Sequence, residues 1–331
     1  MPKGKNQKLK LYRLYEYLLR MTDEDHAVTM PQIKEELERY DITADRKSLY
    51  SDIEETSVLG IKVEGYQEGR GYYYHVVEKQ FELAELKLLV DAVGSAKFIS
   101  EKKSKELIKK LENFASIYEA RELQRQVVTS GRVKTMNESI YYNVDEIHRA
   151  ISENRRITVK YWKWNLNKEM ELKKDGQLYE VSPWALAWDD ENYYLIAYDE
   201  KDQKIKHYRV DKMKTITTTE NRRNGRELFE RFDVAAYTKR SFGMYGGEKE
   251  KVKLRVKNHL VGVIIDRFGK DISLHEDDGE HFMVNVDVNL SAQFFAWVFG
   301  LGDGIEIIGP KSAREGMKQQ IEAVGAGYRK P

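Results

Sequence analysis

A histidine and an arginine share one face of a predicted strand near the middle of the chain. Side chains alternate over Lys204–Val210, which places His207 and Arg209 on one face and Tyr208 and Val210 on the other. Arginine offers a planar fork of donors and a protonated imidazole adds two more, so the pair could bind an anion. A solvated strand face without a ligand explains the same spacing equally well.

Two more predicted strands come directly before this one. The first ends at Trp188, the second covers Asn192–Tyr198, and polar turns at 189–191 and 199–203 separate the three strands. Alternation of this kind is typical of a small antiparallel barrel or sandwich. The three strands lie within Ser182–Met213, and we expect the rest of the chain to be organised around this stretch.

The same stretch resembles the heart of the WYL domain. A Pro-x-x-Leu segment, Pro183–Leu186, precedes an aromatic-Tyr-Leu strand, Tyr193–Leu195, and an aromatic-Arg-hydrophobic-Asp pattern, Tyr208–Asp211, follows it. The first residue of the central motif is Tyr193 rather than the Trp that gives the family its name. The resemblance implies an Sm-like (SH3-like) β-barrel, placed at residues 138–220, that senses a ligand within a bacterial transcriptional regulator.

An anionic effector, either a nucleotide or a single-stranded nucleic acid, is the ligand that this resemblance implies. Arginine would bind a phosphate through its planar fork, and a tyrosine at position 161 or 194 could stack on a base. The residues expected to line the effector pocket are Tyr161, Ser182, Tyr194, His207 and Arg209.

Composition narrows the class of protein. The 331 residues suffice for two or three domains, and 56 Lys and Arg against 55 Asp and Glu give no overall basic field, so DNA contacts must use local patches. The absence of cysteine excludes disulfides, zinc–thiolate sites and cysteine nucleophiles. No signal peptide and no apolar run near the ~18 residues of a membrane span are evident, so we expect a soluble cytoplasmic protein without membrane contact.

Residues 1–77 are predicted to form a winged helix-turn-helix domain. Helices are indicated at 8–21, from Pro31 onward and at Ala44–Val58, and a hairpin follows whose loop covers Gly65–Gly71. The third helix of such a domain can enter the major groove of DNA. A winged helix that binds another protein is the alternative.

Within the third helix, residues 45–53 resemble the recognition helix of the winged helices that precede WYL domains. Ser51 departs from that pattern, in which arginine is common. Residues 1–76 hold twelve Lys and Arg against fourteen Asp and Glu, so the basic groups must lie on one face. The residues expected to contact double-stranded operator DNA are Arg46, Lys47, Ser48, Tyr50, Ser51 and Arg70.

A helical connector is predicted at residues 78–137, and a long linker at residues 221–250. The connector has amphipathic helices at Phe81–Lys97 and Glu101–Tyr118, and its polar stretch around Gly131 is expected to loosen the chain before the next domain. We expect the connector to couple the DNA-binding and sensor domains, and its apolar stripe could pack within the chain or between subunits.

Residues 251–331 are predicted to form a ferredoxin-like domain, which makes the whole chain a multidomain α+β protein. The predicted order is strand, helix, strand, strand, helix, strand, and then a last helix at Ser312–Val324 opened by a capping box of Ser312 and Glu315. The segment resembles the WCX extension that is often found after WYL domains.

Nothing in the sequence indicates catalysis, a cofactor or a metal. The glycines form no phosphate-binding motif, and no serine lies in a nucleophile elbow. His275 and His281, with four acidic residues between them, are the one cluster with metal-like content, and they fall on a predicted hairpin turn where such residues are ordinarily solvated. We therefore expect a binding protein rather than an enzyme.

Two classes of function remain. The favoured one is a DNA-binding transcriptional regulator whose WYL domain senses an anionic effector. The alternative is an accessory protein, for example of a phage-defence system, that binds nucleic acid or a partner without controlling a promoter. We expect a two-fold homodimer that reads an inverted repeat, with Trp297 at or near its interface or else packed inside its own domain.

Overall fold

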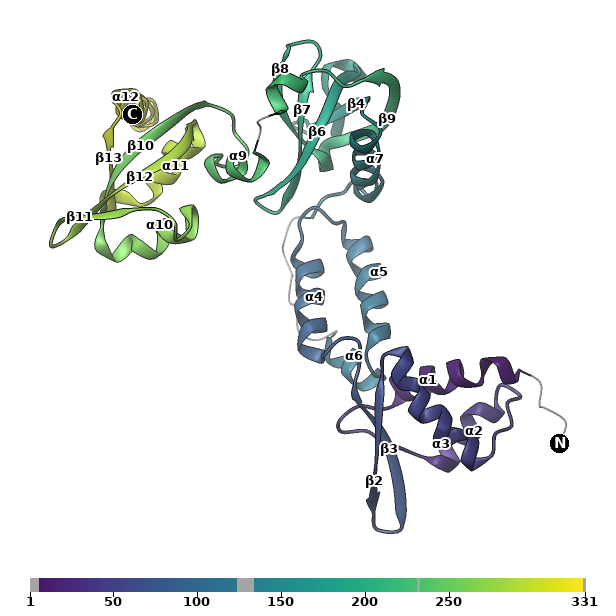
Figure 1. Ribbon diagram of the computed structural model, residues 1–331. Coiled ribbons are helices and arrows are strands. Elements are labelled where there is room, and N and C mark those ends of the chain that lie inside the picture. Colours follow the sequence, from purple (N-terminus) through teal and green to yellow (C-terminus); the bar gives the residue numbers. More distant parts are fainter. Residues whose placement is uncertain (1–5, 124–133, 231–232, 330–331) are drawn as a thin grey trace. The chain divides into compact units, whose positions relative to one another are not determined.

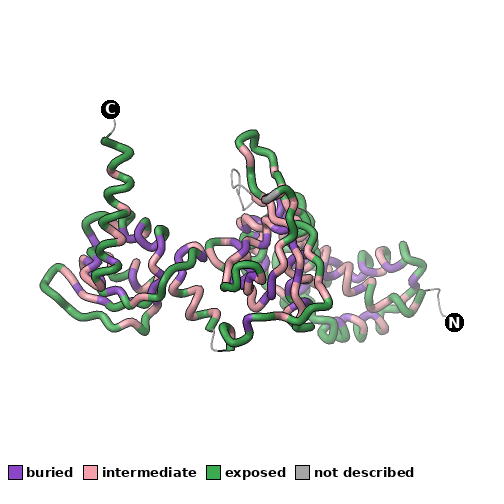
Figure 2. The backbone as a smooth tube through the Cα atoms, turned by 90° about the horizontal axis from the view of Figure 1, so that it is seen from above, coloured by how far each residue is buried: buried purple, intermediate pink, exposed green. Residues whose placement is uncertain are grey.

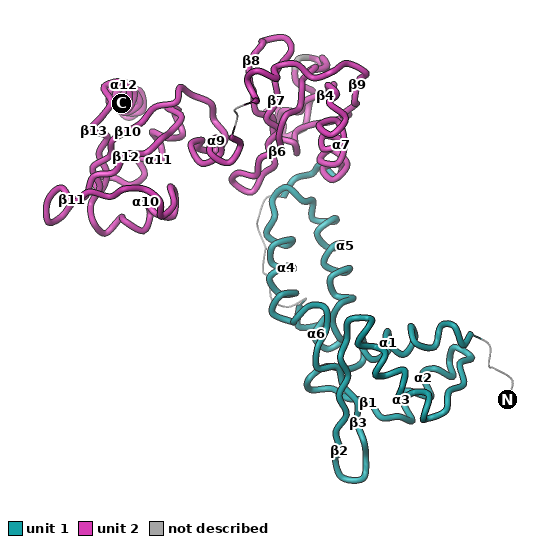
Figure 3. Tube along the Cα trace, viewed as in Figure 1, with its two compact units in different colours: residues 1–138 teal, residues 139–331 magenta. Residues whose placement is uncertain are grey.

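A computed structural model describes residues 6–123, 134–230 and 233–329 of the chain (Figure 1). Buried residues lie among the helices and strands of each part, and exposed residues cover the outside (Figure 2). The chain divides into two compact units, Met1–Glu138 and Ser139–Pro331 (Figure 3). Gly131, around which we predicted a loose junction, lies outside the described residues.

Three helices and a small sheet form the first part of unit 1. Apolar residues three and four apart turn one face of each helix inward, so Leu14, Ile33 and Leu49 are 0 % exposed. The last of the three helices starts where Asp45 accepts the backbone N–H of Ser48 at 2.8 Å. The elements are α1 (Lys10–Met21), β1 (Val28–Thr29), α2 (Met30–Glu38), α3 (Arg46–Glu55), β2 (Lys62–Glu68) and β3 (Gly71–Glu78), and the strand order is β1-β3-β2.

The β2–β3 hairpin is longer than predicted, and the prediction of a loop over Gly65–Gly71 is wrong. Gly65 pairs with Tyr74 inside the ladder, and only Gly69–Arg70 connect the strands. A Cβ atom at Gly65 would lie 2.4 Å from the ring of Tyr72, so this glycine leaves room for an aromatic ring above the strand. The short strand β1, which pairs with β3, was not predicted.

Three further α-helices follow in the described part of unit 1: α4 (Leu83–Ser95), α5 (Glu101–Leu111) and α6 (Ile117–Leu123). The single helix predicted at 101–118 is wrong, because the chain becomes extended at Ala115 (φ −120°, ψ 162°). Arg20 of α1 donates to the carbonyl oxygens of Glu112 at 2.7 Å and Ala115 at 3.0 Å. These are acceptors that a helix end leaves without partners, so a contact from a distant segment stabilises the break.

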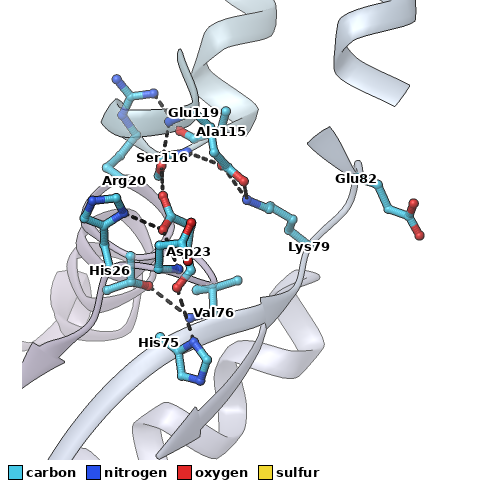
Figure 4. A network of polar contacts seen from close by, with 12 residues as sticks. Arg20, Asp23, His26, His75, Val76, Lys79, Glu82, Ala115, Ser116 and Glu119 are labelled. Atoms are coloured by element: carbon cyan, nitrogen blue, oxygen red, sulfur yellow. Dashed lines mark hydrogen bonds and ion pairs between the residues drawn. The ribbon is translucent and has the colours of Figure 1, made fainter. Parts of the chain in front are cut away.

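A buried carboxylate connects the end of α1 to the start of α6. Asp23 is 5 % exposed, accepts a hydrogen bond from Ser116 Oγ and lies 2.6 Å from Nδ1 of His26 (Figure 4). Burial raises the pKa of Asp23, but the hydrogen bonds from Ser116 and His26 outweigh burial and the pKa is lowered. The His26 ring stacks on Tyr118, with 3.5 Å between the ring centroids. Asp23 is thus an ionised, fully bonded link between these two elements.

One helix and six antiparallel strands form the first part of unit 2. The strands predicted to end at Trp188 and to cover 192–198 and 204–210 are present, but the predicted hairpin at Asp175–Gly176 is wrong. That dipeptide closes a short 3₁₀ turn, and the strand before it pairs with β4 rather than with the strand after it. The elements are α7 (Ile140–Ser152), β4 (Arg155–Trp164), β5 (Met170–Leu172), β6 (Tyr179–Asp189), β7 (Asn192–Asp199), β8 (Lys204–Arg209) and β9 (Met213–Arg222), in the sheet order β5-β4-β6-β7-β8 with β9 also paired to β4.

The segment predicted as a long linker is ordered over most of its length. It contains α8 (Arg226–Phe229) and α9 (Val234–Arg240). The ring of Phe229 stacks on that of Trp184 in β6, with 4.9 Å between the centroids, and Met244 is only 4 % exposed. Gly- and Arg-rich composition indicated a tether, but its scattered aromatic and apolar side chains pack on the sheet.

A four-stranded antiparallel sheet and its helices form the rest of unit 2. In the strand at His281–Leu290, Val284, Val286 and Val288 are buried, whereas Asn285 and Asp287 are exposed. The alternation in the sequence predicted this pattern. The elements are β10 (Glu248–Lys257), α10 (Val261–Phe268), β11 (Leu274–Asp278), β12 (His281–Leu290), α11 (Ala292–Gly300), β13 (Ile305–Gly309) and α12 (Lys311–Tyr328), in the sheet order β11-β12-β10-β13.

The structure tests two predictions for this sheet domain, one on a helix cap and one on Trp297. The capping box of Ser312 and Glu315 is wrong: α12 starts at Lys311, directly after Pro310, and has no side-chain cap. Trp297 packs inside the domain, with its ring 5.4 Å from Phe242 and 5.7 Å from Phe268, so the intradomain alternative describes it.

No helix in the described ranges is both long and apolar enough to cross a membrane.

Close backbone packing at the start of β10 predicts an intolerance to side chains. A Cβ atom at Gly247 would lie 1.9 Å from the carbonyl oxygen of Leu290, a backbone atom held in the β10–β12 ladder. We expect Gly247→Ala to lower the free energy of unfolding by about 1–3 kcal/mol, as overpacking does. Gly246→Ala is the matched control, because nothing lies within 4 Å of its Cβ position. Equal denaturant midpoints for the two variants would contradict this packing.

Candidate nucleic-acid interface and effector pocket

One face of α3 is exposed and carries basic and aromatic side chains. Leu49 is buried on the opposite face, and the helical period places four of the predicted DNA contacts together on the exposed one. These four residues are Arg46, Lys47, Tyr50 and Ser51. The face matches the one predicted from the sequence.

Ser48 has a different environment from its neighbours. Its hydroxyl accepts a hydrogen bond from Lys10 Nζ of α1, and the same ammonium lies 2.6 Å from Asp52 Oδ2. Ser48 therefore connects two helices of the unit and is only partly exposed. Of the predicted DNA contacts on α3, it is the one that the structure turns toward the protein.

The buried Tyr74 connects two exposed tyrosines, Tyr50 on α3 and Tyr72 on the hairpin. Tyr50 hydrogen-bonds Tyr74 of β3, and the guanidinium of Arg46 lies 5.9 Å from the ring centroid of Tyr50. Burial raises the pKa of Tyr74 and the hydrogen bond to Tyr50 raises it further, so the Tyr74 hydroxyl remains neutral. The ring of Tyr72 lies next to that of Tyr74, with 5.1 Å between the centroids, so Tyr50, Tyr74 and Tyr72 form a row.

Arg70 lies apart from this row, in the turn at the tip of the hairpin. The other hairpin cation, Lys62, pairs with Glu64 and Glu78 at 3.1 Å each. Arg70 forms no ion pair within the described residues and is exposed. It is thus the hairpin group whose charge remains available to a phosphate.

In unit 2 a cavity of about 530 Å³ opens beside β7 and β8. It brings together four of the five residues predicted to bind an effector and adds one new cation. Its lining includes Tyr161, Tyr194, His207, Arg209 and Lys212. Further walls come from Asp190, from Gly243–Gly246 and from Gln293 of α11.

The guanidinium of Arg209 is largely used by the protein. Its Nε and Nη2 donate to the two carboxylate oxygens of Asp211 at 3.0 and 2.9 Å, and Nη2 also donates to Asn192 at 2.8 Å. The hydrogen bond to Asp211 raises the pKa of Arg209. Its backbone N–H donates to the hydroxyl of Tyr161 at 3.0 Å. The planar fork expected to bind a phosphate thus already binds a carboxylate, and Arg209 orders the pocket wall.

His207 reaches the cavity as a neutral side chain. Burial lowers the pKa of His207, and a hydrogen bond to the backbone of Met244 opposes this shift without cancelling it. Its Nε2 is buried and has no hydrogen-bond partner in the described part of the chain. The ring lies 5.3 Å from that of Tyr237 in α9. His207 is therefore one uncharged polar group at the pocket, not the second cation that the sequence suggested.

Ser182 does not belong to the pocket. It is 0 % exposed, donates a hydrogen bond from Oγ to Glu200 and accepts one from the backbone N–H of Asn224 at 2.8 Å. Its position just before the Pro-x-x-Leu segment suggested a ligand contact. The structure assigns its hydroxyl to tying β6 to the chain after β9.

A second hollow of about 300 Å³ shares Tyr161 and His207 with the first. Lys206 also lines it, and its Nζ lies 2.7 Å from Asp199. Burial raises the pKa of Asp199, but hydrogen bonds from Lys206 and Tyr208 outweigh burial and lower it to about 2. This carboxylate therefore stays ionised and holds Lys206 against the sheet, so the charge of Lys206 is compensated.

Sequence reasoning missed Lys212 and the segment around Met244. Lys212 follows the aromatic-Arg-hydrophobic-Asp pattern by one residue, and its ammonium has no ion pair among the described residues. That adjacency was the available signal. The Met244 segment had none, because it is distant in the sequence and reaches the pocket only through folding.

Acidic clusters elsewhere do not extend the candidate site. A hollow of about 840 Å³ in unit 1 includes Asp25, Glu82 and Glu122 and would repel an anion. At the β11–β12 turn, Arg255 binds Asp277 and Asp278 at 2.6 Å each, and Asp278 also bonds His281. Among the described residues no group of three or more side chains is arranged to hold a metal ion.

Comparison with protein-family models identifies two domains in unit 2. The WYL domain model matches residues 142–218, which include Tyr161, Tyr194, His207, Arg209 and Lys212 of the pocket. The WCX domain model matches residues 248–325, the four-stranded sheet domain. The chain therefore contains a WYL domain followed by a WCX domain, and both resemblances are confirmed.

Among solved structures, the proteasome accessory factor B/C (PafBC) of Arthrobacter aurescens is 18 % identical over 100 % of this chain and 50 % of its own, with a TM-score of 0.29. This chain thus spans half the length of that protein. A CRISPR Cas-related protein is 12 % identical over 97 % of this chain and 84 % of its own, with a TM-score of 0.36. TM-scores this low define neither fold nor function. No curated protein matches the chain.

Proposed function

We propose that this protein is a transcriptional regulator that binds operator DNA through unit 1 and senses an anionic effector through its WYL domain. The observation that carries the proposal is the exposed basic and aromatic face of α3 in a chain that also contains a WYL domain with a cation-lined pocket. Its role is binding rather than catalysis.

The arrangement of unit 1 supports a winged helix-turn-helix reading. Three helices precede a hairpin, and the third helix presents its exposed face beside the hairpin's tyrosines. In this reading α3 enters the major groove, Arg46 and Lys47 contact bases or phosphates, and Arg70 at the wing tip contacts the backbone. The strand orders of unit 2 support an Sm-like barrel for the WYL domain and a ferredoxin-like fold for the WCX domain.

The pocket supports a nucleotide or a single-stranded nucleic acid as the effector. Lys212 offers an uncompensated ammonium for a phosphate, while Tyr161 and Tyr194 offer ring faces for a base. Burial raises the pKa of Tyr161 to about 12, so its hydroxyl stays neutral and adds no repulsion toward an anion.

DNA binding is tested by an electrophoretic shift of the region upstream of the protein's own gene. We expect Arg46→Ala/Lys47→Ala to weaken binding by about 1–3 kcal/mol for a lost base contact, and to flatten the salt dependence by about one phosphate contact. Arg39→Ala is the matched control, because Arg39 is exposed on the neighbouring helix and paired with Glu35 and Glu36. Equal affinities for the two variants would contradict the interface. Failure of the wild-type protein to bind would favour the accessory-protein alternative.

Effector binding is tested by the fluorescence anisotropy of a short single-stranded oligothymidylate, with ATP as competitor. We expect Lys212→Ala to weaken binding about tenfold, the value of one charge-assisted hydrogen bond. Lys204→Ala is the control, because Lys204 is exposed on β8 and does not line the pocket. Arg209 is unsuitable for this test, since its loss would also remove the hydrogen bonds that it donates to Asp211 and Asn192. If neither probe binds, or if both variants bind alike, the effector class or the pocket is wrong.

We also propose that the regulator is a two-fold homodimer. Two exposed apolar surfaces support it: Leu88 and Leu89 on α4 are 71 % and 38 % exposed, and Ile321 and Val324 on α12 are each 46 % exposed. Light scattering at micromolar concentration is expected to give twice 38.9 kDa. Two double variants then identify the interface, because the variant that disrupts it should be a monomer. These variants are Leu88→Glu/Leu89→Glu and Ile321→Glu/Val324→Glu. A monomeric wild-type mass would contradict the proposal.

A further inference from the structure

A tight turn at Ser241–Tyr245, called the strap below, joins the WYL domain to the WCX domain. The N–H of Tyr245 donates to the carbonyl of Phe242 at 3.2 Å, and Gly243 and Met244 both have positive φ angles, 58° and 56°. Positive φ at both central residues is the pattern of a type I′ turn, which is compact and stiff. The side chains on either side of Gly243 are therefore held in a fixed relation to each other.

One end of the strap is inserted in the WYL domain. The side chain of Met244 is 4 % exposed and packs in a cluster with Ala187 of β6 and Ile196 of β7. Its backbone is also held, since the N–H of Met244 donates to the carboxylate of Asp189 and its backbone forms the hydrogen bond with His207 described above. Four residues from three strands, β6, β7 and β8, thus hold Met244.

The other end is inserted in the WCX domain. Phe242 is 6 % exposed, and its ring lies 5.4 Å from that of Phe294 and under the guanidinium of Arg267 at 4.0 Å. Arg267 also donates to the carbonyl of Ser241 at 2.6 Å, and Asn289 donates to its hydroxyl at 2.9 Å. Phe242 and Met244 are two residues apart, so each domain core contains one end of the same turn.

The insertion of Met244 has unfavourable features as well as favourable ones. Asp189 Oδ2 and His207 Nε2, which flank it, are buried and have no hydrogen-bond partner in the described part of the chain. A left-handed φ is also unfavourable for a residue with a side chain. Burial of the flexible thioether side chain and the two backbone hydrogen bonds of Met244, with Asp189 and His207, oppose these terms. The seated and released positions of the strap should therefore differ little in free energy.

We propose that the strap is a relay: an occupant of the effector pocket displaces Met244 and so releases Phe242 in the WCX domain. Gly243–Gly246 already form one wall of the pocket, next to Tyr194 and Lys212. While Met244 is inserted in the WYL domain, Asp189 Oδ2 and His207 Nε2 have no hydrogen-bond partner among the described residues. An occupant that donates a hydrogen bond to Asp189 and forms one with His207 would satisfy both atoms. The relay rests on the proposed function only for the identity of that occupant.

The chain contains no cysteine, so single cysteines can report on the strap in the full-length protein. Without any ligand, we expect Met244→Cys to react with a thiol reagent about tenfold faster than Val159→Cys or Val284→Cys, because local opening needs less free energy than unfolding of a core strand. Both reference positions are 0 % exposed, one in each domain. Equal rates at the three positions would overturn the proposal, since the strap would then open only when the domains unfold.

Coupling between the two ends is tested by removing one of them. Phe242→Ala should speed the labelling of a cysteine at position 244 by about fivefold, because a turn that loses one anchor opens more often. Phe299→Ala is the matched control: the same truncation in the WCX domain, at a side chain that is 59 % exposed and outside the strap. An unchanged rate with Phe242→Ala would overturn the relay. Should a cysteine variant fail to fold, hydrogen exchange of the Tyr245 N–H in the wild-type protein, compared with strand β7, measures the same opening.

Ligand response separates the relay from the proposed function. With oligothymidylate bound, as judged by anisotropy, Phe242→Cys should be labelled about tenfold faster than without it, and this position reports from the WCX core where the ligand does not shield it. Binding without faster labelling overturns the relay and leaves the effector proposal intact. If oligothymidylate does not bind, the effector proposal is overturned. The labelling rates measured without ligand then show by themselves whether the strap opens.

Discussion

The two-residue alternation along β7 and β8 is the constraint on which the candidate pocket depends. It sends Leu195 and Tyr208 into the WYL core and turns Tyr194, His207 and Arg209 to the opposite face. A shift of one residue in the β7–β8 register would exchange these two sets. Packing of the core and composition of the pocket are therefore set by the same pairing, in which Tyr194 lies opposite Arg209.

Buried charge in this protein is mostly satisfied by the protein itself. Asp23 and Asp199 are buried and keep their charge because of their hydrogen-bond partners. The half-buried Arg209 also has its guanidinium bonded within the protein. Removing one partner from such a group is costly, since the other charge stays buried. A charged residue in a hollow is thus a weak indication of ligand binding until its partners are known. Lys212, which has no ion pair within the described residues, is the stronger candidate.

The two halves of the proposed regulator use different physical means. On α3 the exposed guanidinium and ammonium groups suit a long-range, salt-dependent attraction to phosphates. In the WYL pocket one uncompensated ammonium acts beside aromatic rings and a neutral imidazole, which suits recognition at short range. The strap belongs to neither type of contact. It offers packing that is fixed at both ends, which is what a change in one domain needs in order to reach another.

The sequence by itself determined the strands and helices that have a strong period. The motifs around Tyr194 and Arg209 determined the WYL domain, and the order of strands and helices in residues 251–331 determined the WCX domain. It also placed Arg46, Lys47, Tyr50 and Ser51 on one helix face, because helical geometry is local. Only the tertiary structure decided what each polar group binds. Ser182 and Ser48 turned inward, Arg209 found Asp211, the helix at 101–118 ended where Arg20 reaches its carbonyls, and the presumed linker packed through Phe242 and Met244. Partners of this kind lie far apart along the chain, and a periodic pattern carries no information about which distant side chain will satisfy a given donor or acceptor.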